Sequence, residues 1–327
     1  MKLLWILLGA AALLALAVLG ICYYCFRVAF YAPRNQKHDP EKLDTPVGEI
    51  YDPYREDMER WILEARAMKQ ERFTIQSFDG LTLHGTFYEY APGAPMELMF
   101  HGYRGSAERD MSGGVQRCFR LGRSALIVDQ RCSRESGGNV ITFGIREYKD
   151  CLRWVDFAVE HFGKNVKIIL TGISMGASTV MMAAGEPLPE NVIGVLADCG
   201  YNSPKAIIHE VLRQMKLPPK LCYPFVKLAA RIYGHFDLEE NSPEEALKRA
   251  KVPVIFFHGE ADDFVPCWMS RVCFDACVSR KKLVTVPGAG HGLSYPTDME
   301  GYLIAVREFF GPDASADGDS NARKHTI

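Results

Sequence analysis

The stretch IILTGISMGASTVMM, residues 168–182, predicts a buried strand, a sharp turn and a helix in immediate succession. Ser174 lies at the turn, within the five residues GISMG. The two glycines fit this geometry, because a nucleophile held on so sharp a turn leaves no room for side chains on its neighbours. The turn also brings backbone N–H groups to a helix N-terminus, where they stabilise an oxyanion. Ser174 is therefore a candidate nucleophile, although the pattern also fits a serine in an ordinary tight connection.

The residues around this stretch alternate between apolar strands and helical patterns. Two β-rich runs near the start are joined by Asp79 and Gly80, which is a hairpin signal. Further strands are expected at 96–102, 124–130, 166–172, 192–198, 252–259 and 281–288, with helices near 106–121 and 144–162. Continuous apolar strands separated by helices indicate an α/β fold, with a mostly parallel sheet covered by helices on both faces and an antiparallel hairpin at its start.

Residues 201–250 interrupt this alternation, because they contain two or three helical patterns and no convincing strand. The insertion follows a core strand and therefore starts at the carboxyl edge of the sheet, where such folds bind ligands. We expect it to form a small helical cap over the site. The alternative is that it only adds to the core.

Two later strand ends supply a base and an acid for Ser174. A serine needs a base to take its proton, and the base needs an acid to orient it. His291 follows the last strand and stands between two glycines, and Asp262 follows the strand before it. Asp262 is preferred over Asp263 because it has the Asp-x-x-Val-Pro setting. Asp198, which ends an earlier strand, is a second candidate acid.

The stretch FHGYRGSAE, residues 100–108, follows the third strand, where an oxyanion hole can take its second amide. The expected donors are the backbone N–H groups of Tyr103 and Met175. The Tyr103 side chain is expected to line the pocket, and His101 to serve as a structural hydrogen-bonding residue beneath the loop. Arg104 either contacts the substrate or is simply solvated.

The motifs HGYRG, DQR, GISMG, ADCGY, HGEADDFVP and GAGHG stand, over roughly 70–310, in an order that resembles the α/β-hydrolase superfamily of serine hydrolases. The chain is similar to the membrane-anchored bacterial branch grouped with serine aminopeptidase-like hydrolases. The resemblance implies the α/β-hydrolase fold and a catalytic triad of Ser174, Asp262 and His291. One loop departs from the family's Asp-x-Arg-Gly-His-Gly-x-Ser-x-Gly, since this chain has DQRCSRESGG at 129–138, so we expect a different pocket shape there.

The first residues differ in kind from the rest. From Leu3 to Phe26 the chain has no charged residue, and a helix of that length reaches roughly 36 Å, enough to span a bilayer. Tyr23, Tyr24 and Arg27 are typical of the membrane interface. We expect an uncleaved anchor. The alternative, a cleaved signal peptide, is disfavoured because its apolar core would span only about 7–15 residues.

The positive-inside rule places the body of the protein in the cytoplasm rather than outside the cell. Arg27, Arg34, Lys37 and Lys42 follow the apolar segment, whereas only Lys2 and the amino terminus precede it. The cysteines of the body have no paired spacing, which suits a reducing compartment. They are Cys118, Cys132, Cys151, Cys199, Cys222, Cys267, Cys273 and Cys277.

The chain is expected to comprise six segments. They are a transmembrane anchor and flank (1–33), a linker and amphipathic helix (34–69), the first part of the hydrolase core (70–200), a helical cap insertion (201–250), the second part of the core (251–311) and a disordered tail (312–327). A net charge of −2 without a basic stripe argues against nucleic acid as a partner. No four cysteines have zinc-site spacing, and no metal or organic cofactor is expected.

The predicted function is a serine hydrolase that cleaves an ester or thioester through an acyl-enzyme. The anchor and the apolar cap helices favour a small, acylated or lipid-like substrate. A peptidase of the same fold is the first alternative and would need acidic residues to grip a substrate amino terminus, for which Glu108, Glu135 and the run DLEE (237–240) are candidates. A non-catalytic binding protein is the second alternative, but such a chain would be expected to lose a triad member.

Overall fold

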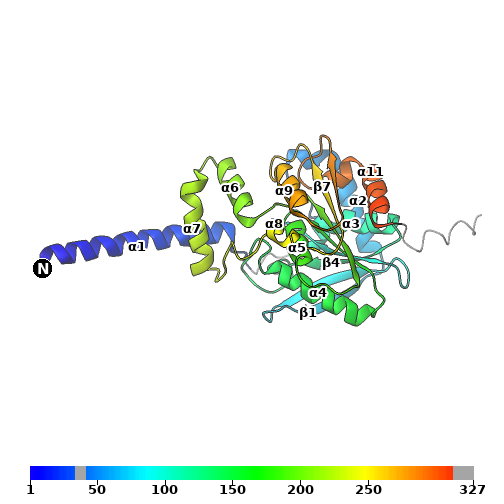
Figure 1. Ribbon diagram of the computed structural model, residues 1–327, viewed down its shortest axis with the longest axis horizontal. Helices are drawn as coiled ribbons and strands as arrows, with labels where there is room; N and C mark the ends of the chain where they lie inside the picture. Colours follow the sequence, from blue (N-terminus) through cyan, green and yellow to red (C-terminus); the bar gives the residue numbers. More distant parts are fainter. Residues whose placement is uncertain (34–41, 312–327) are drawn as a thin grey trace, which may run out of the picture.

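A computed structural model of the protein describes residues 1–33 and 42–311. The eight strands form a single sheet in the order β1-β2-β4-β3-β5-β6-β7-β8 (Figure 1). The strands are β1 (Glu71–Gln76), β2 (Thr82–Tyr88), β3 (Met96–Phe100), β4 (Ser124–Asp129), β5 (Ile168–Ile173), β6 (Val192–Asp198), β7 (Val254–Gly259) and β8 (Lys281–Val286). The predicted linker residues 34–41 and the predicted disordered tail, 312–327, lie outside the described residues.

The pairing of the strands confirms the mostly parallel sheet that the sequence predicts. β1 and β2 form an antiparallel hairpin, and β2 pairs antiparallel with β4. All the other neighbours, from β4 through β3, β5, β6 and β7 to β8, are parallel. The carboxyl ends of β3, β5, β6, β7 and β8 therefore lie along one edge, which is where open α/β sheets bind ligands.

Helices cover both faces of the sheet. The helices are α1 (Lys2–Ala29), η1 (Glu49–Tyr54), α2 (Arg55–Ala67), α3 (Ala107–Arg120), α4 (Glu147–Phe162), α5 (Met175–Ala184), α6 (Pro204–Gln214), α7 (Pro219–Ile232), α8 (Pro243–Leu247), α9 (Trp268–Ala276), α10 (Ser294–Thr297) and α11 (Met299–Phe310). Side chains of α2, α3 and α11 pack on one face, and those of α4, α5, α8 and α9 pack on the other (Figure 1).

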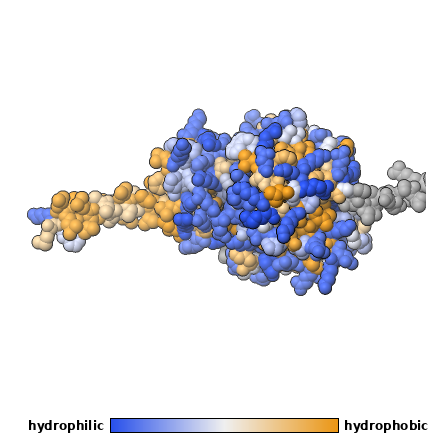
Figure 2. Space-filling view, in the orientation of Figure 1, coloured by the Kyte–Doolittle hydropathy of each residue, from blue (hydrophilic) through white to orange (hydrophobic). Residues whose placement is uncertain are grey.

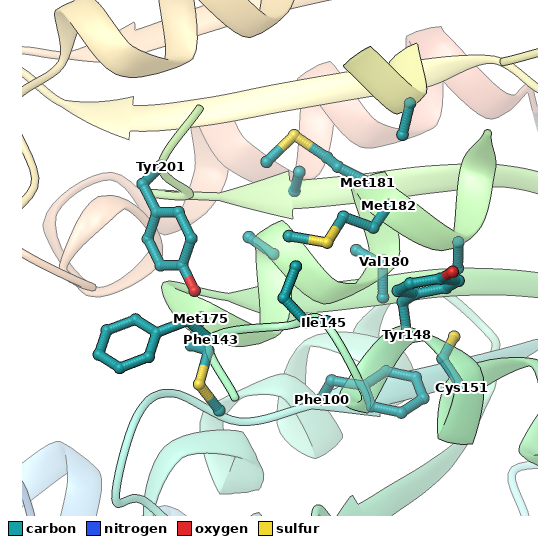
Figure 3. Close-up of a cluster of buried hydrophobic side chains, with 14 of the residues drawn as sticks. Phe100, Phe143, Ile145, Tyr148, Cys151, Met175, Val180, Met181, Met182 and Tyr201 are labelled. Carbon is teal, nitrogen blue, oxygen red and sulfur yellow. The ribbon is translucent and has the colours of Figure 1, made fainter. Parts of the chain in front are cut away.

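The centre of the core explains why its strands carry unbroken apolar runs. Every residue of β3 and β7 is buried, because helices cover both of their faces. Every residue of α5 is also buried, and small or unbranched side chains allow it to lie close to the sheet. Figure 3 shows Met181 and Met182 of α5 inside this cluster, with Phe100 of β3 and Tyr148 of α4 nearby. Ser174, the residue before α5, therefore adjoins a helix that is buried along its whole length.

Two elements project from this core. α1 extends away from the sheet as the long blue helix of Figure 1, and among the described residues it is the single helix long and apolar enough to cross a membrane. The insertion between β6 and β7 contains α6, α7 and α8, and α7 lies across the C-terminal half of α1. α8 instead packs on α5 in the core.

Candidate active site

Ser174 occupies a strained turn between β5 and α5. Its φ of 55° and ψ of −119° place a non-glycine residue in a backbone region that L side chains rarely adopt. The flanking glycines make the turn possible. A Cβ on Gly172 would lie 2.2 Å from the Gly176 carbonyl carbon, and a Cβ on Gly176 would lie 1.9 Å from the Phe100 oxygen. The two glycines of GISMG are thus required by close backbone packing around the serine.

His291 joins the serine to an acid. Its Nε2 lies 3.0 Å from Ser174 Oγ, and its Nδ1 lies 2.7 Å from Asp262 Oδ2. The three residues come from the ends of β5, β7 and β8, which the parallel topology brings to one edge. With Nδ1–H donating to the carboxylate, Nε2 is left as the acceptor for the Ser174 hydroxyl proton. This is the geometry that a serine nucleophile and its base require.

Asp262 is held ionised by its surroundings. Burial alone would raise its pKa, but hydrogen bonds from His258 and His291 outweigh burial and lower the pKa to about 2. The other carboxylate oxygen, Oδ1, accepts the backbone N–H groups of Phe264 and Val265 at 3.0 and 2.8 Å. These contacts fix the carboxylate with Oδ2 directed at the imidazole.

Asp198 and Asp263, the two alternatives to Asp262, have other surroundings. Asp198 is buried at the end of β6, where its carboxylate accepts the hydroxyl protons of Ser294 at 2.7 Å and Tyr302 at 3.2 Å. Asp263 is exposed, and its backbone carbonyl accepts a hydrogen bond from Gln214. Among the described residues, Asp262 is the carboxylate that bonds to His291.

The two expected oxyanion donors lie on either side of the serine. Met175 is the first residue of α5, so its N–H has no partner within the helix. Within residues 1–33 and 42–311, the Tyr103 N–H also has no acceptor. Hydrogen bonds to Asp110 and His101 fix the loop that carries Tyr103. Asp110 accepts the Gly102 N–H at 2.9 Å, and His101 bonds to the Gly102 carbonyl at 2.8 Å and to the Gln130 N–H at 3.0 Å.

The side chains of Tyr103 and Arg104 reach the end of α1. The Tyr103 hydroxyl donates to the Ala29 carbonyl at 2.8 Å. Arg104 Nη2 donates to the Val28 carbonyl at 2.8 Å and to the Tyr31 carbonyl at 3.1 Å. The last carbonyls of a helix lack partners within the helix, and a cation also favours that end of the helix dipole. Arg104 thus ties the oxyanion loop to α1.

Known proteins resemble this chain in sequence and in fold. No protein-family model matches the chain. In sequence it is 23% identical to the uncharacterized protein YqkD of Bacillus subtilis over 308 residues, which cover 93% of this chain and 96% of YqkD. It is 24% identical to the protein bem46 of Schizosaccharomyces pombe over 250 residues, which cover 74% of this chain and 77% of bem46.

Solved structures of similar shape identify the fold. The esterase Pf2001 of Pyrococcus furiosus aligns with a TM-score of 0.62 and 20% identity over 84% of this chain and 98% of the esterase. The alpha/beta hydrolase GrgF of a Penicillium species aligns with a TM-score of 0.58 and 17% identity over 74% of this chain and 98% of GrgF. The chain has the α/β-hydrolase fold. Its resemblance to the serine aminopeptidase-like branch stays a prediction.

A cavity of about 220 Å³ lies above Ser174 and His291. Its lining is mostly apolar, with side chains from three regions of the α/β-hydrolase fold. They are Tyr51, Met58 and Trp61 from η1 and α2, Met111 from α3, and Tyr295 from α10. Tyr103 also lines the cavity. Such a lining suits the apolar portion of a substrate.

The cavity is covered by a different segment from the one that the sequence suggests. Its described lining includes Pro46 and residues of η1 and α2, but none from 201–250. The insertion contacts the site region through Gln214 of α6, which donates to the Asp263 and Phe264 carbonyls. The helices of the insertion also pack on α1, α5 and α9. The difference arises because α7 packs against the apolar helix α1. Sequence patterns do not show which elements pack together.

The acidic residues that a peptidase would need do not line this cavity within the described part of the chain. Glu108 pairs with Arg66 at 2.7 Å, and Glu135 is exposed on the outside of the sheet. The run DLEE pairs with basic residues of α4 and α7. The one acid of the α3 N-terminus that reaches the cavity, Asp110, is occupied by Arg109 and by the Gly102 N–H.

The loop that departs from the family pattern is structural. Arg131 pairs with Asp150 at 2.7 Å and with Asp79 of the β-hairpin at 3.1 Å. Ser136 donates to the Asp129 carbonyl at 2.7 Å and accepts the His84 N–H at 3.0 Å. These contacts hold the loop against β2 and α4, whereas Cys132 and Ser133 lie in a small hollow beside Met175. The departure thus changes the surface next to Met175, in a hollow that Ser174, Asp262 and His291 do not line.

Sequence reasoning missed three contributors to the site. Asp110 fixes the oxyanion loop, Arg104 ties it to α1, and the segment from Pro46 to Trp61 covers the cavity. The only available signal was the amphipathic pattern of α2, which the sequence analysis placed in a linker region. The partners of the other two residues are fixed by tertiary packing.

Proposed function

We propose that the protein is a membrane-anchored serine hydrolase that cleaves carboxylic esters or thioesters. The observation that carries this proposal is the position of His291, 3.0 Å from Ser174 Oγ and 2.7 Å from the Asp262 carboxylate, at the base of an apolar cavity. The likeness to solved esterases supports the fold on which such a site is built.

In the proposed reaction His291 Nε2 takes the hydroxyl proton of Ser174 while Oγ attacks the substrate carbonyl. The resulting oxyanion accepts the N–H groups of Tyr103 and Met175. The proton on His291 then passes to the leaving alcohol or thiol, and an acyl ester of Ser174 remains. Water, deprotonated by His291, cleaves that ester, and the proton returns to Ser174 as the acid leaves. Asp262 stabilises the imidazolium in both halves.

The lining of the cavity supports an apolar acyl group as the substrate portion bound next to Ser174. Aromatic and methionine side chains from η1, α2 and α3 surround the space, and the charge of Arg109 is balanced by Asp110 at 2.7 Å. A buried, unpaired charge on the substrate would have no partner there. Small acylated or lipid-like molecules therefore fit better than charged peptides.

The anchor is the second part of the proposal. α1 has 28 residues with a mean hydropathy of 2.6 in its most apolar window, and none of that window is buried. Such a surface is stable in lipid and costly in water. The basic residues after α1 favour a body on the cytoplasmic side, and all ten cysteines are unpaired, as suits a reducing compartment.

Labelling with a fluorophosphonate probe tests the nucleophile. The full chain, purified in detergent, should be labelled, and Ser174→Ala and His291→Ala should lose the label while remaining folded. Asp263→Asn is the matched control, because this exposed neighbour of Asp262 does not contact the imidazole. A folded wild type that resists the probe would contradict the proposal.

A substrate panel tests the bond. Nitrophenyl esters and acyl thioesters of increasing chain length should be hydrolysed by the wild type and not by Ser174→Ala. Release of amines from aminoacyl reporters, with no turnover of esters, would instead identify a peptidase.

A further inference from the structure

α7 lies against a part of α1 that would be inside a bilayer. The Tyr233 hydroxyl, at the end of α7, donates to the Leu19 carbonyl at 3.2 Å. The ring of Tyr233 also lies 5.5 Å from the Tyr23 ring and 5.8 Å from the Phe26 ring. Leu19 precedes the end of the apolar run at Phe26 by seven residues. At 1.5 Å per residue, this contact lies about 10 Å along the helix from the end of the apolar run.

α7 presents an apolar stripe that no described element covers. Leu221 is 66% exposed and Leu228 is 38% exposed. Their spacing of seven residues places them on the same face of the helix. The preceding turn adds Met215 and Leu217, which are also exposed. We call these four residues the membrane-contact face.

Basic side chains accompany this face. The segment 204–235 contains only one acidic residue, Glu210. Its basic residues are Lys205, Arg213, Lys216, Lys220, Lys227 and Arg231. Of these, Lys216 and Lys220 flank the membrane-contact face at the turn between α6 and α7 and are exposed. An apolar stripe edged by lysines is the pattern of helices that lie in the interface of an anionic bilayer.

We infer that the α6–α7 hairpin is a membrane-surface element that lies at the boundary between the headgroups and the acyl chains of an anionic bilayer, beside α1. The inference rests on the proposal that α1 spans the bilayer. Once Leu19 is in lipid, α7 can lie only at the membrane surface, because Tyr233 is bonded to it. Figure 2 shows the hydrophobic surface of α1 running up to the globular body, where hydrophilic residues begin. Two residues of the membrane-contact face, Leu221 and Leu228, belong to α7, the helix that crosses α1 (Figure 1).

This arrangement gives the insertion a role other than capping the cavity. It buries the apolar stripe of α7 in lipid, whereas a free monomer in water would leave it exposed. It also fixes the orientation of the body on the membrane, because α1 and α7 cross one another and together define a plane. The active-site cavity is then held at a set height above the lipid.

Site-specific photocrosslinking in vesicles tests the inference. The full chain is reconstituted in vesicles of phosphatidylcholine and phosphatidylglycerol that contain a clickable phospholipid. p-Benzoylphenylalanine replaces Leu221 in one variant, Leu13 of α1 in a second and Ile304 of α11 in a third. The last two side chains are 69% and 52% exposed, so all three positions accept a bulky probe. α11 lies at the far end of the body from α1 (Figure 1).

Lipid adducts are expected at positions 13 and 221 and not at 304. An adduct at 13 without one at 221 would overturn the membrane-surface inference and leave the anchor intact. Loss of both would overturn the anchor itself, and retention of esterase activity in that case would separate this failure from that of the hydrolase proposal. A crosslink from 221 to another copy of the chain would assign the face to self-association instead.

The charges give a second test. With the probe at position 221, Lys216→Glu together with Lys220→Glu should lower the yield of lipid adduct in vesicles with phosphatidylglycerol. The adduct at position 13 should not change. An unaltered yield at 221 would overturn the part of the inference that assigns anionic lipid to this face.

Discussion

The loop after β7, which carries Asp262, and the loop after β3, which carries Tyr103, meet at Ser174 but are fixed in different ways. The loop after β7 is held by hydrogen bonds within the core. The Ala261 N–H donates to the Ala289 carbonyl at 3.0 Å, and Asp262 accepts two N–H groups of its own loop. The loop after β3 is held by the Asp110 carboxylate, which accepts the Gly102 N–H. It is also held by the end of α1, whose carbonyls accept hydrogen bonds from the Tyr103 and Arg104 side chains.

The difference indicates that half of the proposed catalytic apparatus is self-contained, whereas the other half depends on α1. The acid and base lie on neighbouring parallel strands and would keep their geometry without α1. The oxyanion loop would lose the acceptors for Tyr103 Oη and Arg104 if α1 moved. We therefore expect changes on the two sides to affect catalysis to different degrees and through different kinetic constants.

The largest effect is expected from Asp262→Asn. The amide cannot hold the Nδ1–H tautomer of His291 or stabilise the imidazolium, so kcat/KM should fall by on the order of 10³–10⁴. The residual fold should persist, because the amide oxygen can still accept the N–H groups of Phe264 and Val265. Ester hydrolysis and circular dichroism measure the two quantities. A loss of less than about tenfold would remove Asp262 from its proposed role.

Arg104→Ala tests the other side and should have a smaller effect. The Tyr103 N–H would remain, but its loop would lose the tie to the Val28 and Tyr31 carbonyls. Because the N–H would then be misplaced rather than removed, kcat should fall by about tenfold and KM should change little.

Arg104→Lys is the matched variant, since a lysine can still donate to one carbonyl, and it should recover part of kcat. An increase in KM with unchanged kcat would show instead that Arg104 binds substrate. That result would break the comparison between the two loops.

Asp198→Asn tests whether both buried carboxylates on the core side of the site, Asp198 and Asp262, contribute to stability and activity. Burial raises the pKa of Asp198, and the hydroxyls of Ser294 and Tyr302 only partly oppose this. Its folded pKa therefore exceeds the unfolded value of about 3.9, and the free energy of unfolding falls as pH rises from about 4 toward the folded pKa. The asparagine does not titrate, so urea unfolding of the variant should show less of this fall.

The activity of Asp198→Asn should stay within about threefold of the wild type, because Asp198 makes no hydrogen bond to His291 in the described structure. A loss as large as that of Asp262→Asn would mean that both acids serve the imidazole. The contrast between the two variants thus identifies which strand end supplies the acid.

The sequence predicted the core side of the site far better than the side tied to α1. Ser174, Asp262 and His291 follow strands whose apolar runs are readable, and parallel topology brings such ends together. The choice of Asp262 over Asp263 rested on local context, whereas in the structure it depends on which carboxylate the loop turns toward the imidazole. The ties of Tyr103 and Arg104 to α1 join residues more than 70 positions apart, and no local pattern encodes such a pairing.

The segment that covers the cavity illustrates the same limit. The amphipathic pattern of α2 predicted a helix with one apolar face, but the pattern cannot say that Met58 and Trp61 face a substrate cavity. The insertion 201–250 was predicted to be helical from its helical patterns, and its partner, α1, lies about 200 residues away in sequence. Periodicity identifies apolar faces, and tertiary packing decides what each face meets.

Tyr302→Phe should have the smallest effect and tests the support of Asp198 on the core side. The Tyr302 ring is stacked on the Phe257 ring, with 3.6 Å between their centroids, and should remain in place. Only the hydroxyl that donates to Asp198 is lost. Ser294 still donates to the other oxygen, and the expected cost is about 1 kcal/mol in the free energy of unfolding with kcat unchanged. Tyr90→Phe, at an exposed tyrosine, is the control and should show no loss. In the Asp198→Asn background the cost should shrink, because the charge that the hydroxyl stabilises is absent. An equal cost in both backgrounds would show that the Tyr302 hydroxyl does not act by stabilising the charge of Asp198.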